Sequence, residues 1–462
     1  MHRKTFLLVT TLLLLVPAEA QFPRLWGMTA IGGANNKGTI FYMDGDGTDY
    51  TTVFDFDEVS GSGLEGTLCL APNGKLYGTS NEGGSADPAS GTLFSYDPVN
   101  ELFEKHVDFD GINGGTGWGG MVVAPDGLLY GGCCSGGGTG GCIYRVEPST
   151  DGYTIAYALD AAADGSGIQD RLLLTPDGTF FGLAREGGAN NGGTLFHYDP
   201  NSGTYNVLHH FDGGLNGRTP LGIPCVADDG WLYIATLEGG TDDKGILCRY
   251  EPVDNTFQKL LDFTGPNGQA PWNAPVRIGP DLLMGTTALG GSNGSGLIYR
   301  YIPSTNTLSE AYSFNGLDGG VLHGNIHRSA DGTFYGMSNA GGTGFVGTIY
   351  RFDPQTNGLN TLHSLSMLEG YGAQGDMIEV GNAVSVTEHA GPRRLTLFPN
   401  PAADHITVRT EGARPVRIRD AMGRMVAMYS VKSSIALIDV EALSPGVYSV
   451  EAGSAIGLFV KE

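Results

Sequence analysis

Short apolar or alternating segments, bounded by Gly, Asn, Asp and Pro, make up most of this chain. One of them, Leu76-Tyr77-Gly78, recurs in related form at intervals of 51 to 53 residues, and a second, Gly91-Thr92-Leu93-Phe94, follows each copy of the first. A fixed period of this length indicates repeated structural units. The seven copies of the first segment begin at Leu25, Leu76, Leu129, Phe180, Leu232, Leu283 and Phe334.

Each unit has the pattern of four short strands. In the second unit we predict them at 67–71, 75–79, 92–96 and 103–109, and the turn Pro72-Asn73-Gly74 joins the first two. Asn-Gly supplies the positive φ angles that a tight hairpin needs. Four antiparallel strands per unit are typical of propeller blades. The sequence therefore predicts an all-β protein with a seven-bladed β-propeller over residues 21–381.

The two ends of the repeat region complement each other. The first unit begins directly at Leu25 and lacks a first strand, whereas an extra strand is predicted at 376–380, after the seventh unit. Pairing of 376–380 with 25–29 would close the ring and remove two exposed sheet edges.

The N-terminus has the features of a signal peptide. A short basic start precedes an apolar run from Phe6 to Val16 and then Ala18-Glu19-Ala20, so we predict that residues 1–20 are removed after Ala20. That run is too short to span a bilayer, and we expect no transmembrane segment elsewhere.

Glycine content and charge exclude other classes of protein. The 75 glycines argue against a stack of helices. The formal charge is -23, and residues 21–392 contain 15 basic and 41 acidic residues, a net charge of -26. A surface this acidic repels phosphate backbones, so we expect no nucleic-acid partner.

The repeat resembles the glycine-rich family called GloVer repeats, found in secreted bacterial proteins. The resemblance rests on LYGTSNEGG from Leu76, on GTLFSYDP from Gly91 and on the LHSL strand that follows Thr361. Two departures are Cys133-Cys134 and Ile234, which replace the usual Thr or Gly. The resemblance implies a surface or secreted repeat protein and carries no assigned chemistry.

The composition changes after a predicted linker at 382–394. Alternating strands over 395–462 predict a small β-sandwich. Phe398-Pro399-Asn400-Pro401-Ala402, Gly423-Arg424-Met425-Val426 and Leu443 to Tyr448 make this segment similar to the type A sorting domain of the Bacteroidetes type IX secretion system. The resemblance implies the type IX machinery as partner and a secreted or cell-surface location, followed by release or lipid-linked anchoring. An ordinary accessory sandwich is the alternative.

One acidic loop is a candidate metal site. Asp44, Asp46 and Asp49 place several carboxylate oxygens in one short segment, which favours Ca²⁺ as the only candidate cofactor. The alternative is a simple acidic turn between two strands.

Candidate ligand-binding residues lie in loops predicted to share one face of the propeller. Trp118 and Trp272 are in loops between units, where an exposed indole can stack on a sugar. These features predict a noncatalytic module that binds an extracellular protein or glycan. A glycan-active hydrolase or lyase is the alternative, with Glu82, Glu186 and Glu238 as candidate carboxylates. A purely structural role also remains open. The prediction of a binding face rests on one aligned loop position that varies between the units, which carry Ile31, Glu82, Ser135, Glu186, Glu238, Leu289 and Ala340.

Three of the six cysteines are close in sequence. Cys133 and Cys134 leave one predicted strand and Cys142 enters its antiparallel neighbour, at a separation that suits a disulfide. In an oxidising compartment we expect Cys142 to pair with Cys133 or Cys134, while a vicinal Cys133–Cys134 bridge is the other option.

Overall fold

The structure is a computed structural model with two compact units, Met1–Asn382 and Ala383–Glu462. It describes residues 22–329, 332–380, 397–398, 404–409, 414–420, 425–431, 435–452 and 455–461. The predicted signal peptide 1–20 and the predicted linker 382–394 lie outside the described residues. No helix in the described part is long and apolar enough to cross a membrane.

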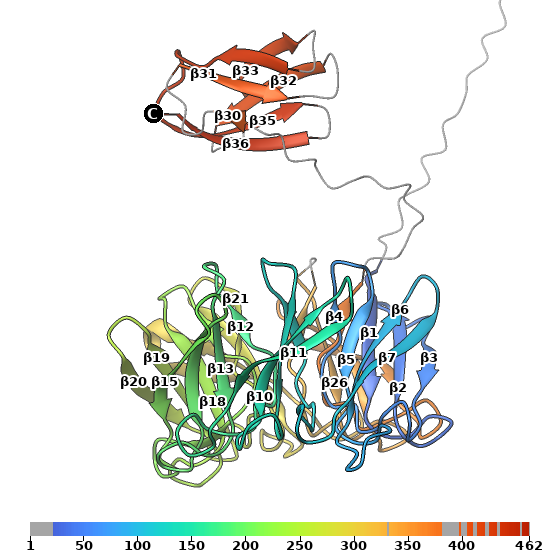
Figure 1. The fold of residues 1–462 in the computed structure, drawn as a ribbon. Helices are drawn as coiled ribbons and strands as arrows, with labels where there is room; N and C mark the ends of the chain where they lie inside the picture. Colours follow the sequence, from blue (N-terminus) through green and yellow to red (C-terminus); the bar gives the residue numbers. More distant parts are fainter. Residues whose placement is uncertain are drawn as a thin grey trace, which may run out of the picture. The chain divides into compact units, whose positions relative to one another are not determined.

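The described residues of the first unit form seven antiparallel sheets, which we call blades 1 to 7 (Figure 1). Blade 1 contains β29 (Ile378–Glu379), β1 (Arg24–Thr29), β2 (Thr39–Asp44) and β3 (Thr51–Asp55). Blade 2 contains β4 (Cys69–Leu70), β5 (Leu76–Thr79), β6 (Thr92–Asp97) and β7 (Leu102–Asp108). Blade 3 contains β8 (Met121–Val123), β9 (Leu129–Cys133), β10 (Cys142–Glu147) and β11 (Gly152–Ala158).

The other four blades repeat this order. Blade 4 contains β12 (Leu173–Leu174), β13 (Phe180–Ala184), β14 (Thr194–Asp199) and β15 (Thr204–His210). Blade 5 contains β16 (Arg218–Pro220), β17 (Cys225–Val226), β18 (Leu232–Glu238), β19 (Ile246–Glu251) and β20 (Thr256–Asp262). Blade 6 contains β21 (Val276–Gly279), β22 (Leu282–Thr287), β23 (Leu297–Ile302), η1 (Pro303–Thr305) and β24 (Thr307–Ser313). Blade 7 contains β25 (His327–Arg328), β26 (Phe334–Ser338), β27 (Thr348–Asp353) and β28 (Gly358–Ser364).

Blade 1 joins the two ends of the repeat region. β29 pairs with β1 through Leu25↔Glu379 and Trp26↔Ile378, and the Val380 amide donates to the Arg24 carbonyl at 3.0 Å. The predicted pairing of 376–380 with 25–29 is confirmed. The last repeat thus supplies the strand that the first one lacks, and the sheet edge of blade 1 is covered.

The recurring glycines meet a backbone requirement. Gly91 has a φ of 98°, and a Cβ atom there would lie 2.0 Å from the carbonyl oxygen of Ser80. Only glycine tolerates both conditions. The glycine that begins the second repeated segment is therefore fixed by the turn into the third strand of a blade.

A second glycine makes room for an aromatic ring within the blade. A Cβ atom at Gly182 would lie 2.3 Å from the ring of Phe196, its cross-strand partner. In blade 5 the larger residue is on the other strand of the pair, because Ile234 lies opposite Cys248. Both residues are fully buried. The departure at Ile234 therefore conserves packing volume, which cores tolerate better than a net change.

The cysteines near the β9–β10 hairpin are arranged as one opposed pair and one separate thiol. Cys133 lies directly opposite Cys142, whereas the Cys134 thiol donates to the Ile168 carbonyl at 3.3 Å. Hydrogen bonding to Cys142, together with burial, raises the pKa of Cys133. All six cysteines are free thiols in the structure. The geometry favours Cys133 over Cys134 as a partner for Cys142.

We expect a Cys133–Cys142 disulfide in the exported protein, because oxidising compartments favour disulfides between suitably placed cysteines. Such a bridge across a short loop should add about 2–3 kcal/mol to the free energy of unfolding. Peptide mapping under nonreducing conditions should recover one linked peptide that contains both residues. Free thiols at Cys133, Cys134 and Cys142 would contradict this prediction.

The second unit contains two antiparallel sheets. One contains β30 (Leu397–Phe398), β31 (His405–Arg409) and β34 (Ile435–Asp439). The other contains β33 (Met425–Val431), β32 (Arg414–Asp420), β35 (Gly446–Ala452) and β36 (Ala455–Lys461). Ile406 and Ile438 from the first sheet share a buried cluster with Val416, Ile418 and Val450 from the second. This packing agrees with the predicted small β-sandwich.

Candidate ligand-binding site on the propeller axis

A cavity of about 40 Å³ is lined by one equivalent position from every blade. The position lies three or four residues before the inner strand of each blade, and the same 51 to 53 residue spacing separates its copies. A single cavity that touches all seven copies must lie on the propeller axis. We call it the axial cavity; the seven residues are Glu65, Trp118, Gln169, Leu221, Trp272, His323 and Gln374.

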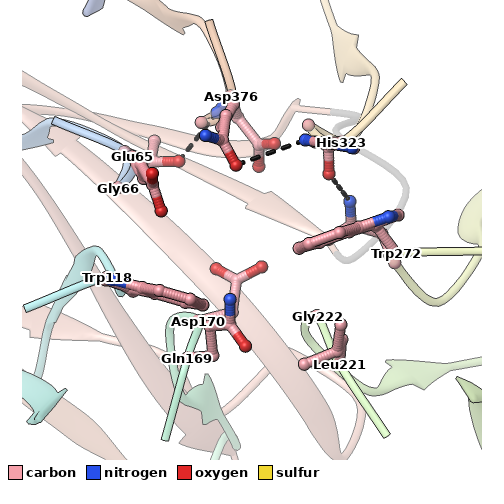
Figure 2. Close-up of a pocket in the computed structure, with 15 residues that line it drawn as sticks. Glu65, Gly66, Trp118, Gln169, Asp170, Leu221, Gly222, Trp272, His323 and Asp376 are labelled. Atoms are coloured by element: carbon pink, nitrogen blue, oxygen red, sulfur yellow. Dashed lines mark hydrogen bonds between the residues drawn. The ribbon is translucent and has the colours of Figure 1, made fainter. Parts of the chain in front are cut away.

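The two indoles occupy opposite sides of the axial cavity (Figure 2). Trp272 stacks on His323 with ring centroids 4.1 Å apart, and the guanidinium of Arg185 lies over Trp118 at 5.5 Å. These contacts fix the two indole planes. Gln374 further positions His323, because its side-chain oxygen lies 3.2 Å from Nδ1. The aromatic walls of the cavity are therefore held in place before any ligand arrives.

The next residue in each unit is usually glycine, for a steric reason. A Cβ atom at Gly324 would lie 2.5 Å from the carbonyl of Gly375, and one at Gly375 would lie 2.1 Å from the carbonyl of Gly66. Close contact between neighbouring blades thus favours glycine around the ring. Asp170 and Asn273 are the exceptions, and both line the cavity. Asn273 donates from Nδ2 to the His323 carbonyl at 2.6 Å.

An ion pair forms the floor of the axial cavity. Arg171 in blade 4 donates to Asp376 in blade 1 at 2.6 Å, and because these blades are not neighbours the pair crosses the axis. Asp376 also accepts from the Asn325 amide at 2.6 Å. A second cavity of about 560 Å³ lies along the inner strands, and Asp376 lines both. The ion pair therefore lies between the two cavities.

Two carboxyl groups of the axial cavity, those of Glu65 and Asp170, have raised pKa values. Burial, assisted by the charge of Asp376, raises the pKa of Asp170 to about 6 despite the opposing effect of Arg171. Burial also raises the pKa of Glu65, while hydrogen bonds from Asn81 and Gln374 act in the opposite direction. For His323, burial lowers the pKa, so the imidazole is neutral at neutral pH.

The structure brings some of the predicted ligand-binding residues together and separates others. Trp118 and Trp272 both line the axial cavity, whereas Glu82, Glu186 and Glu238 do not. Glu82 lines an adjoining groove of about 430 Å³ that shares Glu65 and Trp118 with the axial cavity.

Two of these glutamates have local partners instead. Glu186 pairs with Arg185 at 3.0 Å, and Glu238 pairs with Arg218 at 2.6 Å. The three glutamates come from blades 2, 4 and 5, and those of blades 4 and 5 are held in these local ion pairs.

The acidic loop of blade 1 is organised around an arginine. Arg24 donates to Asp44 at 3.0 Å and to Asp49 at 2.8 Å, while Asp46 accepts from the Thr48 hydroxyl at 2.7 Å. Within the described residues, no three His, Cys, Asp or Glu side chains are placed to hold a metal ion. A calcium ion at this loop would have to displace the Arg24 guanidinium.

Sequence reasoning missed several residues of the axial cavity. Glu65, Gln169, His323 and Gln374 precede the inner strands of their units, as Trp118 and Trp272 do. Aligning the seven units at this position would have revealed them together. Asp170 also stands out in such an alignment, because five of the other six units have glycine at its position.

The family comparisons match nearly the whole chain. The model of the Gloeobacter/Verrucomicrobia repeat matches residues 17–182 and 168–396, and the model of the secretion system C-terminal sorting domain matches residues 396–461. The chain belongs to the Gloeobacter/Verrucomicrobia repeat family. Its C-terminal unit is a type IX sorting domain, which indicates secretion or attachment to the outer surface. No curated protein sequence matches it significantly.

Solved structures share the fold at low sequence identity. A putative 6-phosphogluconolactonase from Bacteroides fragilis has a TM-score of 0.50 and 12% identity, covering 79% of this chain and 99% of its own. The periplasmic gluconolactonase of Pseudomonas aeruginosa has a TM-score of 0.49 and 15% identity, covering 77% and 99%. TolB from Acinetobacter baumannii has a TM-score of 0.39 and 17% identity, covering 62% of each chain. The match therefore spans less than two thirds of TolB, and the likeness to the putative 6-phosphogluconolactonase concerns the β-propeller fold alone.

Proposed function

We propose that this protein is a noncatalytic carbohydrate-binding propeller that acts outside the cell, with the axial cavity as its binding site. The observation that carries the proposal is the composition of the seven equivalent positions. They combine two indoles with four side chains that can hydrogen-bond, on a scaffold whose other repeated positions are mostly constant. Varied side chains on a constant scaffold are typical of a binding surface.

The chemistry of the cavity suits a sugar ring. A pyranose has apolar C–H faces, which pack against an indole, and hydroxyl groups, which pair with amide and carboxyl groups. Trp118 and Trp272 supply the flat surfaces, while Gln169, Gln374 and Glu65 supply hydrogen-bonding groups. The cavity volume of about 40 Å³ holds a few water molecules at most, so a sugar ring would pack on the indoles from the solvent-open side of the cavity. Because the Arg171–Asp376 pair forms its floor, the cavity favours the end of a glycan chain over a continuous strand.

Replacing either wall tryptophan should weaken glycan binding. We expect Trp118→Ala and Trp272→Ala each to reduce the affinity for glycans bound by the wild type by about tenfold or more, the usual size of an aromatic anchor effect. A glycan array followed by calorimetry on the hits would measure this change.

Trp231 provides a matched control. It lies outside the axial cavity, where Arg249 covers its ring at 4.1 Å. Trp231→Ala should therefore leave glycan affinity close to the wild-type value. Equal losses in all three variants would contradict the assignment of the site.

A glycan-active hydrolase or lyase is the second candidate. The raised pKa values of Glu65 and Asp170 favour it, since a carboxyl that keeps its proton can act as a general acid. A polysaccharide-degradation panel separates the two functions. Products that appear with the wild type and disappear with Asp170→Asn would establish the enzyme and overturn the noncatalytic proposal.

A further inference from the structure

Acidic groups outnumber basic groups in the axial cavity. Glu65, Asp170 and Asp376 line it, and neither lysine nor arginine is among its lining residues. Arg171, beneath the cavity, is engaged by Asp376, and Arg185, which lies over Trp118, is engaged by Glu186. His323 is neutral at neutral pH because burial lowers its pKa. When the carboxyl groups are ionised, the site therefore has excess negative charge that no neighbouring cation balances fully.

Asp170 contributes most to this excess. Its carboxyl group is directed into the space between Trp118 and Trp272 (Figure 2). One carboxylate oxygen accepts from the Arg171 amide at 2.6 Å, but among the described residues Asp170 forms no ion pair with any side chain. At the equivalent position five of the other six units have glycine, so the blade structure does not require an acidic residue there.

Two indoles that flank an acidic group form a site suited to a cation. The face of an indole attracts positive charge, and the attraction grows where water is excluded. An ammonium group also donates three hydrogen bonds, which suits adjacent carboxylates. We propose that the axial cavity selects a sugar that carries a protonated amino group, through Asp170 and the two tryptophans. This inference rests on the proposed carbohydrate-binding function and specifies its ligand class.

Because Asp170 has a raised pKa, the preference for an amino sugar should depend on pH. Burial and the neighbouring Asp376 raise the pKa of Asp170 to about 6, while Arg171 opposes the shift. Glu65 has a raised pKa as well. As the pH falls below about 6, Asp170 gains a proton while the sugar amine stays charged, so the ionic attraction is lost. Binding of an amino sugar should therefore weaken between about pH 7 and about pH 5, whereas binding of a neutral sugar should not.

The test compares three β-1,4-linked trimers that differ at one substituent: those of glucosamine, N-acetylglucosamine and glucose. Calorimetry with the full mature chain at about pH 7 should give an affinity for the glucosamine trimer about tenfold above that for the other two. Asp170→Asn retains the shape and an acceptor for the Arg171 amide, and should reduce this ratio to about one.

Glu238→Gln is the matched control, because it removes a carboxylate outside the axial cavity. The ratio should be unchanged in this variant. A similar loss of selectivity in both variants would attribute the effect to bulk surface charge and overturn the inference. Equal affinity of the wild type for all three trimers would overturn the inference and leave the carbohydrate-binding proposal standing. If none of the trimers binds while other glycans do, the inference also fails, and if no glycan binds at all, both proposals fail.

Discussion

A chain that ends at Gly375 should be much less stable than one that ends at Gly381. The shorter chain lacks β29, and blade 1 then loses its pairing with the end of the repeat region. It also lacks Met377, which is 1% exposed, and leaves Arg171 without Asp376. Loss of a buried methionine costs about 2–5 kcal/mol, and breaking a buried ion pair costs about 3–5 kcal/mol. Since Arg171 is partly exposed, we expect a combined loss of at least about 4 kcal/mol.

Denaturant unfolding of the two truncated chains would measure this difference. The chain that ends at Gly381 is the control, because it also lacks the sorting domain but keeps the closing strand. Its transition should be cooperative and occur at a clearly higher denaturant concentration. Unfolding curves that coincide would contradict the role of β29 in holding the ring closed.

Deletion of residues 395–462 should abolish appearance of the protein at the surface of its host. These residues nearly coincide with the match to the secretion system C-terminal sorting domain. A chain without them should accumulate in the periplasm, because the signal that the type IX machinery reads has been removed. Cell fractionation with immunoblotting would locate the product.

The converse experiment provides the control for export. Residues 395–462 fused to a periplasmic reporter should carry that reporter to the surface or the medium. Unimpaired surface appearance of the deleted chain would defeat the sorting assignment, whatever the reporter does.

The overall fold could be predicted because its determinants repeat. The turn at Gly91 and the packing of Phe196 against Gly182 recur with the repeat period, so each unit reports the same local structure. The contact between Ile234 and Cys248 was harder to predict, since the two residues become partners only in the strand register of blade 5. Their sequence separation gives no sign of contact until the register is known.

The binding site was predictable only in part. Trp118 and Trp272 attract attention because tryptophan is rare in this chain, with four residues in all. Asp170, Glu65 and His323 resemble ordinary loop residues in the sequence. They become neighbours because seven inner strands surround one axis, a relation between residues about fifty or more positions apart. Their pKa shifts arise from burial at that axis, which no local pattern encodes.

The most direct test of the binding site is a crystal structure of the protein with a glycan identified by the array. Ligand density is expected in the axial cavity, with a sugar ring packed against Trp118 or Trp272 and its polar groups directed toward Asp170 and Glu65. Density confined to the groove beside Glu82 or to the larger cavity along the inner strands, with the axial cavity free of ligand, would contradict the account.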